Sequence, residues 1–436
     1  VWTGEAAGDL ERLSLHYLRG QLLDGELELV GEVGWAPRLR WDMQASGRNL
    51  DPAELLSQAP GDLSFALDSS GYWDEQQGPV LTLQFDPLSG TLSGQPLVLT
   101  ARVEPNDRGL ALAALHLDRA GNTFTASGQL TPALAVDWRA SMPAPQRVVP
   151  GLDGALSASG RIEGHPAAPR VVVKVRSDSL AYDGLSLAAL DLTAEAGTAA
   201  SDPVALSLRL GGLEQDGEQV LGGLSLTAQG TTARHRLVAD VDAPAGRVMA
   251  RLDGGWDAPS AGWRGTLSSL AILSDVYGEW RSAEPAQFTA RTEDVALSQI
   301  CLDSAAGQAS VCAGGGWVAG DGLQVNGLLR SLPLTRLLAS VRGELDGTFL
   351  ASIDAAGEIR LRTDLDVGPG ALVVEGLEGT REFGHDGGRL SAAVTEDGAR
   401  AVLQLDSDRR RVVDAEISLP GMNRLPPPEP QPLAGR

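Results

Sequence analysis

The chain has 436 residues, of which 43% are hydrophobic and only 4% aromatic, so a large aromatic core is not expected. Its 57 acidic and 35 basic residues give a net charge of −22, which disfavours nucleic-acid binding because phosphate groups are repelled. The same charge disfavours docking of the surface on an anionic membrane, but it leaves open the capture of lipid tails in an apolar cavity. No run of about 18 or more apolar residues occurs, so no segment is expected to span a bilayer.

The N-terminal region alternates between apolar and polar residues. Leu39, Trp41 and Met43 share one parity, and the charged residues Arg40 and Asp42 share the other. A period of two with one apolar side predicts a β-strand. Residues 49–61 interrupt this pattern. Asp51 is a suitable N-cap there and is followed by a proline, so one or two helical turns are expected.

The same alternation continues to residue 420, but the apolar residues have odd numbers in some predicted strands and even numbers in others. The apolar sides of the clearest predicted strands consist of Leu81, Leu83 and Phe85; Leu97 and Leu99; Val171, Val173 and Val175; Leu206, Leu208 and Leu210; and Leu224 and Leu226. Val171, Val173 and Val175 alternate with Val172, Lys174 and Arg176. Short helical segments are expected at residues 268–284 and 332–341.

Turn signals recur at roughly 8–12-residue intervals, which is typical of all-β architecture. No long amphipathic helix is present to connect parallel strands, so a mainly antiparallel sheet with one dry and one wet face is expected. We interpret residues 1–436 as one continuous repetitive segment, with weak boundaries near 142–150 and 269–288. Residues 422–436 are rich in proline and are expected to form an extended connector.

Two cysteines, Cys301 and Cys312, are separated by a segment with a glycine near its middle, which suits a hairpin that places them opposite each other. They are either two unrelated small core residues or a disulfide. The pattern favours the disulfide, which would contribute about 3 kcal/mol of stability in the chain-entropy model. A disulfide would also place the chain in an oxidising compartment.

No motif for catalysis, cofactor binding or metal binding stands out. The sequence AGGGWVAGDG at residues 313–322 loosely matches a dinucleotide fingerprint, but Gly320 and Gly322 oppose the helix that should follow it. Two cysteines cannot complete a zinc site, and the five histidines lie far apart in sequence. We therefore expect a protein that is not an enzyme, with no catalytic residues, no cofactor and no metal.

Four passages together resemble the AsmA-like/TamB family of bacterial intermembrane bridge proteins. They lie at residues 31–67, at 151–187, between CLDSAAGQASVCAGGGW and LPLTRLL at 301–338, and at ISLPGMNRLPPPEPQPLAGR, 417–436. The resemblance implies a β-taco, which is an elongated, curled sheet that forms an open hydrophobic trough with a few short helical turns. It also implies a central-to-C-terminal periplasmic fragment of a Gram-negative protein. The inner-membrane anchor and the C-terminal region that contacts the TamA barrel are expected to be absent here.

The resemblance and the alternation together favour a bridge that conducts phospholipids by holding their acyl chains along the dry face. The alternative is a scaffold that assembles outer-membrane proteins and autotransporters by pairing with their β-strands. A third class, a carbohydrate-processing solenoid enzyme, is disfavoured because clustered acids and aromatic sugar platforms are missing. The expected lipid-groove residues are Leu39, Trp41, Met43, Leu81, Leu83, Phe85, Leu97, Leu99, Val171, Val173, Val175, Leu206, Leu208, Leu210, Leu224 and Leu226.

Overall fold

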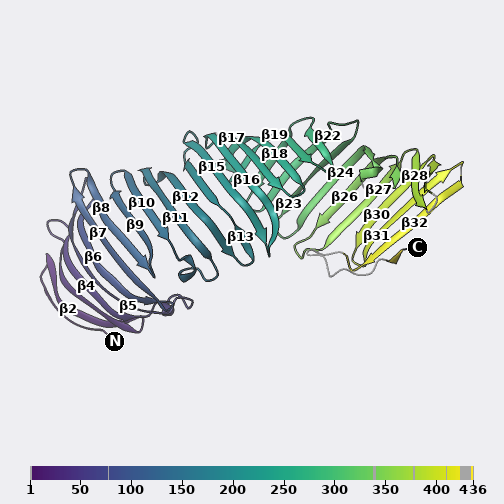
Figure 1. Cartoon of the computed structure of the whole chain (residues 1–436). Coiled ribbons are helices and arrows are strands. Elements are labelled where there is room, and N and C mark those ends of the chain that lie inside the picture. Colours follow the sequence, from purple (N-terminus) through teal and green to yellow (C-terminus); the bar gives the residue numbers. More distant parts are fainter. Residues whose placement is uncertain are drawn as a thin grey trace. The chain divides into compact units, whose positions relative to one another are not determined.

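The structure is a computed structural model that describes residues 2–76, 78–336, 340–376, 379–408, 410–422 and 434–435. It divides into two compact units, unit 1 (Val1–Thr232) and unit 2 (Ala233–Arg436), which are described separately. Within the described ranges, regular structure consists of β-strands and short 3-10 turns (Figure 1). This confirms the predicted all-β, antiparallel class. No helix in the described ranges is long and apolar enough to cross a membrane.

Unit 1 is a series of strands in which each strand pairs antiparallel with its neighbours along the chain (Figure 1). The exception is β13, which continues the ladder of β14 and pairs with the same two strands, β12 and β15. The bounds are β1 (Trp2–Gly8), β2 (Arg12–Leu22), β3 (Gly25–Gly34), β4 (Arg40–Leu50), η1 (Pro52–Glu54), β5 (Gly61–Asp74), β6 (Gly78–Leu92), β7 (Gln95–Asn106), β8 (Gly109–Arg119), β9 (Asn122–Gln129), β10 (Leu134–Met142), η2 (Pro145–Arg147), β11 (Asp153–His165), β12 (Ala168–Tyr182), β13 (Leu185–Leu187), β14 (Leu190–Gly197), β15 (Pro203–Gln215) and β16 (Glu218–Thr231).

Unit 2 contains a second antiparallel series and a separate small sheet of β25, β28 and β29. Strand β24 pairs with β26, and β27 pairs with β30, so the small sheet interrupts the chain order of the main one. The bounds are β17 (Arg234–Ala243), β18 (Gly246–Asp257), η3 (Ala258–Ser260), β19 (Gly262–Ser274), β20 (Gly278–Ser282), β21 (Ala286–Arg291), β22 (Asp294–Ser304), β23 (Ser310–Val318), β24 (Gly322–Pro333), η4 (Leu334–Arg336), β25 (Val341–Arg342), β26 (Glu344–Ile353), β27 (Ile359–Val367), β28 (Gly370–Gly376), β29 (Gly379–His385), β30 (Gly387–Thr395), β31 (Gly398–Ser407), β32 (Arg410–Pro420) and β33 (Ala434–Gly435).

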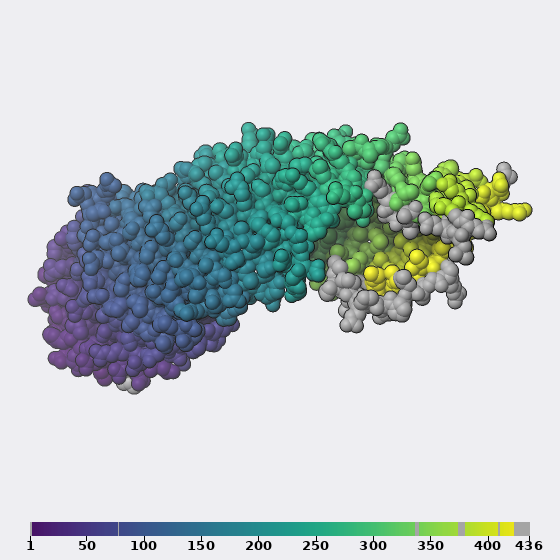
Figure 2. Space-filling view, in the orientation of Figure 1, coloured from purple at the N-terminus to yellow at the C-terminus, as the bar shows by residue number. Residues whose placement is uncertain are grey.

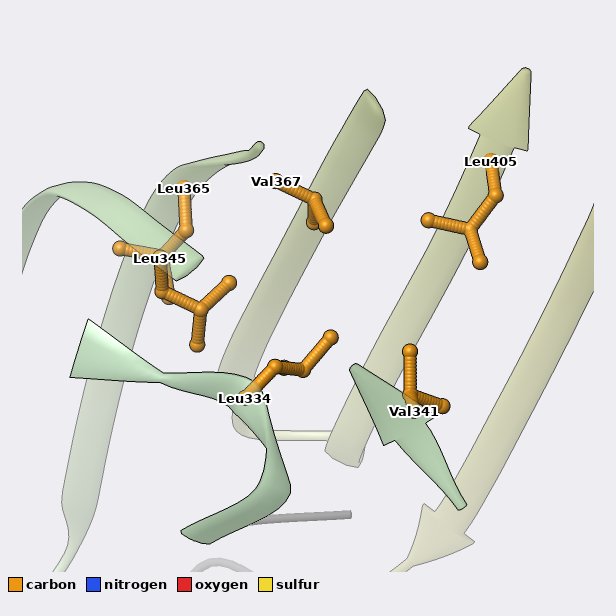
Figure 3. Packing of buried hydrophobic residues seen from close by; sticks show 6 residues of the cluster. All are labelled: Leu334, Val341, Leu345, Leu365, Val367 and Leu405. Carbon is orange, nitrogen blue, oxygen red and sulfur yellow. The ribbon is translucent and has the colours of Figure 1, made fainter. Parts of the chain in front are cut away.

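Buried hydrophobic residues are distributed differently in the two units. In unit 2 they form clusters, of which the larger surrounds Leu334, Leu345 and Leu405, each 0% exposed (Figure 3). In unit 1 the buried hydrophobic residues are spread over separate strands, as with Leu97 on β7 and Val136 on β10. The described elements of unit 1 contact mainly their pairing neighbours, so this sheet has no separate layer of strands or helices packed on it.

The expected helical turns are partly correct. Asp51 caps η1, because its side chain accepts a hydrogen bond from the amide of Ala53 at 3.0 Å. The short helix η4 lies within the expected segment 332–341. The helix expected at 268–284 is wrong: this segment is the end of β19, a turn and β20. Its apolar run LAIL is too short for periodicity to distinguish helix from strand, and pairing with β18 decides for the strand.

The two weak boundaries expected near residues 142–150 and 269–288 coincide with η2 and with the turn region around β20, and they stay predictions, as does the single continuous segment. Most of the proline-rich connector at 422–436 lies outside the described residues.

Candidate apolar binding face

The register of unit 1 shows which side chains share a face, because directly paired residues of antiparallel strands point to the same side. Trp41 on β4 lies opposite Val33 on β3 and Gly71 on β5, and Gly71 lies opposite Leu81 on β6. Met43 follows the same path through Ser69 to Leu83. These residues therefore belong to one face, which we call the apolar face.

The apolar face continues through the rest of unit 1. Leu83 lies opposite Val103, and Leu99 lies opposite Leu117, which in turn faces Phe124. A row of directly opposed residues then runs across six strands, consisting of Trp138, Gly160, Val173, Ala194, Leu206 and Ala228. On β6, the β-bulge between Phe85 and Leu88 leaves both residues on the apolar side, because Phe85 lies opposite Ala101 and Leu88 lies opposite Leu99.

All of the residues expected to line a groove that belong to paired strands lie on this face, and the place of Leu39 on it stays a prediction. Leu39 precedes β4 and is 44% exposed. The apolar residues have odd numbers on β12 and even numbers on β15, but they lie on the same face. Val175 lies opposite Leu192, and Leu192 lies opposite Leu208. The shared face is a structural fact, whereas contact with lipid stays a prediction.

The opposite face, which we call the polar face, carries charged residues. Lys174 lies opposite Ser159 and Thr193. Ion pairs on this face join Arg19 to Glu28 at 2.8 Å, Arg161 to Asp137 at 2.7 Å, Arg176 to Asp191 at 3.2 Å, and Arg170 to Glu163 and Glu195. The hydrogen bond to Glu195 raises the pKa of Arg170. Solvent screens ion pairs of this kind, so they indicate a wet surface and contribute little to the stability of the sheet.

Exposure also differs between the faces. Val171, Val173 and Val175 are half-buried, whereas Lys174 and Arg176 are exposed. Stacked rings add contacts along the apolar face, with centroids 5.6 Å apart for Phe65 and Phe85 and 6.0 Å apart for Phe124 and Trp138. The indole N–H of Trp41 donates to the Ser69 hydroxyl at 3.0 Å, so this polar group is satisfied on the apolar side. The face can therefore accept an apolar ligand without leaving that donor unpaired.

Two hollows of unit 1 are lined mainly by residues of the polar face, although Trp41 and Gly71 of the apolar face also border the first of them. One of about 660 Å³ is lined by Ser14, Glu32, Arg40 and Asp42, all of the polar face, together with some neighbouring residues. Another of about 580 Å³ includes Arg19 and other polar-face residues. These hollows are charged and open, so they do not suit an acyl chain.

In unit 2, the predicted hairpin places Cys301 on β22 directly opposite Cys312 on β23, and the two form a disulfide with a Cα–Cα distance of 3.9 Å. Cys312 is 1% exposed, so the bond is shielded from solvent on that side. The predicted disulfide is thereby confirmed in the structure. Among the described residues, no group of three or more His, Cys, Asp or Glu side chains is placed to hold a metal ion.

The family model for the N-terminal domain of TamB matches residues 1–425. The chain is also similar to the translocation and assembly module subunit TamB of Haemophilus influenzae (strain ATCC 51907 / DSM 11121 / KW20 / Rd), with 24% identity over 272 residues. That match covers 62% of this chain and 21% of the relative. No solved structure matches. The sequence led us to expect a central-to-C-terminal fragment, whereas the matching family model describes an N-terminal domain.

Proposed function

The chain belongs to the TamB family, and on this premise we propose that it is part of a periplasmic bridge that conducts phospholipids along the apolar face of unit 1. The observation that carries the proposal is the continuity of that face across the strands of one single-layered unit. A sheet of this kind leaves apolar surface in contact with water unless something covers it. Acyl chains supply the missing contacts, since each buried methylene contributes about 0.8 kcal/mol.

The pairing of unit 1 favours lipid over an unfolded β-strand as the ligand. Strand addition requires a free backbone edge. Strands β2 to β15 each have a partner on both sides, so their backbone groups are already used. These strands present side chains on one face, and a flexible apolar chain can lie across such a face. The scaffold function therefore remains the alternative, with less support along the length of unit 1.

The family and the disulfide together indicate the cellular compartment. We propose that the protein works in the periplasm of a Gram-negative bacterium, where the bond between Cys301 and Cys312 is stable. We further propose that it acts in outer-membrane biogenesis, including protein secretion by autotransporters, with a TamA-like outer-membrane barrel as a partner. An enzymatic role is not proposed, because the family is one of transport and assembly proteins.

The test compares two adjacent residues on opposite faces. A photo-crosslinking amino acid is placed at Val173 or at Lys174 in the full chain, which is then irradiated with vesicles of phosphatidylethanolamine and phosphatidylglycerol. We expect a lipid adduct from position 173 and none above background from position 174. An adduct from position 174 alone would show that the facing is wrong. Capture of an unfolded barrel protein, and no lipid, at position 173 would favour the scaffold.

A further inference from the structure

Unit 2 has an apolar face of its own, defined by the same register rule. Val325 on β24 lies opposite Ala351 on β26, which faces Leu361 on β27. Leu361 faces Val394 on β30, which faces Ala399 on β31. Nearer the other end of the same strands, the corresponding row consists of Leu329, Gly347, Leu365, Leu390 and Leu403. The apolar face of β24 to β31 thus has two halves, one at each end of the strands.

Among the described residues, the small sheet packs on the second half. We call η4 and the strands β25, β28 and β29 the cover. Leu334 of η4 and Val341 of β25 pack against Leu345, Leu365, Val367 and Leu405 of the main sheet (Figure 3). All six are at most 5% exposed. Leu372 of β28 packs against this cluster from the cover, and Leu403 packs against it from the main sheet.

The first half lacks such a cluster among its described residues. Ala351, Leu361, Val394 and Ala399 are each half-buried. The view in Figure 2 shows a hollow on unit 2 whose floor is formed by green to yellow residues, the colours of the strands from β26 onward. The two halves of one face therefore differ, because the second contains a cluster that the cover buries and the named residues of the first keep part of their surface exposed.

The register identifies β28 and β29 as an insertion. Val367, the last residue of β27, lies directly opposite Gly388 of β30. Two strands paired in this way need only a two-residue turn to connect them. Residues 369–385 are therefore an excursion from an otherwise simple hairpin, whereas Gly387 is already part of β30 and pairs with Asp406 of β31.

Specific contacts join the strands of the cover to one another. Arg342 of β25 forms an ion pair with Glu382 of β29 at 2.8 Å, and its carbonyl oxygen lies 3.0 Å from Nε2 of the buried His385. The backbones of β25 and β28 approach so closely that a Cβ on Gly370 would lie 1.9 Å from the Arg342 carbonyl oxygen. Only glycine fits at that position, so the contact between β25 and β28 is built into the sequence.

We propose that the cover occupies the part of the unit 2 apolar face that an acyl chain would otherwise take, and that it confines the lipid path to the half containing Ala351, Leu361, Val394 and Ala399. This inference rests on the proposed function, because it assumes that acyl chains bind apolar sheet faces of this protein. Its physical basis is the closed cluster, since side chains without exposed surface have no contact left to offer a ligand.

The test places the photo-crosslinking residue at Ala399 or at Leu403 in the full chain, with the same phosphatidylethanolamine and phosphatidylglycerol vesicles. Both positions are half-buried and lie on one strand and one face, but Leu403 packs against the closed cluster, to which Ala399 does not belong. We expect a lipid adduct at Ala399 and none above background at Leu403. Two changes should then uncover position 403. One replaces residues 368–387 by Asn-Gly, and the other is Leu372→Asp, which puts a charge under the cover. Leu350→Asp is the control, because Leu350 is 57% exposed and lies on the opposite face.

An adduct at Leu403 equal to that at Ala399 in the unchanged protein would overturn the inference. So would the failure of both variants to gain an adduct at Leu403 while Ala399 still gives one. If Val173 captures lipid and Ala399 does not, the unit 2 inference fails and the proposed function stands. If Val173 captures no lipid either, the proposed function fails, and the inference fails with it.

Discussion

A charged side chain on the apolar face should weaken lipid binding, and the same charge one residue away should not. Val173 and Val172 are adjacent on β12 and both half-buried, but they point to opposite faces. Val173 lies between Gly160 and Ala194, with no charged neighbour directly opposite. Val172 lies between Arg161 and Glu195 on the polar face. The pair Val173→Asp and Val172→Asp therefore differs in the face that receives the carboxylate.

The expected size of the effect follows from the geometry. Strands are about 4.8 Å apart, so an acyl chain crossing one strand covers about four methylenes. At about 0.8 kcal/mol for each buried methylene, and with only one side of the chain in contact, losing this strand costs about 1.5 kcal/mol. This corresponds to about a tenfold increase in the dissociation constant for lipid.

The assay is equilibrium binding of a fluorescent phospholipid to the full chain, together with urea denaturation of each variant. We expect about tenfold weaker binding for Val173→Asp and little change for Val172→Asp, while the free energies of unfolding of the two variants agree within about 1 kcal/mol. Equal weakening in both variants would refute the assignment of faces. Unchanged binding in Val173→Asp, with the fold intact, would refute the apolar face of unit 1 as the lipid site.

Three further outcomes test the structure itself. Replacing Cys301 and Cys312 by alanine should lower the free energy of unfolding by about 3 kcal/mol in urea denaturation, and a denaturation midpoint that a reductant does not move would argue against a structural disulfide. Gly160→Ala should cost about 1–3 kcal/mol by the same method, because the new Cβ would lie 2.3 Å from the carbonyl oxygen of Val172 and 2.7 Å from a ring carbon of Trp138. The control, Gly223→Ala, has its nearest neighbour at 3.5 Å and should change little. Two backbone amides donate to the Asp51 carboxylate and lower its pKa below the ordinary 3.8. The cap should therefore be complete above that value and be lost as the pH falls through the lowered pKa, so an NMR titration midpoint at or above 3.8 would contradict it.

Much of the fold was readable from the alternation of side chains. The spacing of Val171, Val173 and Val175 alone predicts that they share one side of a strand, and the register confirms it. The hairpin that joins Cys301 to Cys312 was predictable too, because a short segment with a central glycine brings its own ends together. Both features are local, and local geometry is what a period of two encodes.

Features that depend on contacts between residues far apart in the chain cannot be predicted from this alternation. The apolar run at the end of β19 has no distinctive period, and only its pairing with β18 makes it a strand. The strands β28 and β29 have the sequence of an ordinary hairpin, and nothing in it shows that they leave the main sheet and cover Leu365 and Leu405. The sequence by itself determined which residues of a strand face the same way. The tertiary structure decided which strands share a face and where that face is closed, because pairing register and packing arise from contacts between residues far apart in the chain.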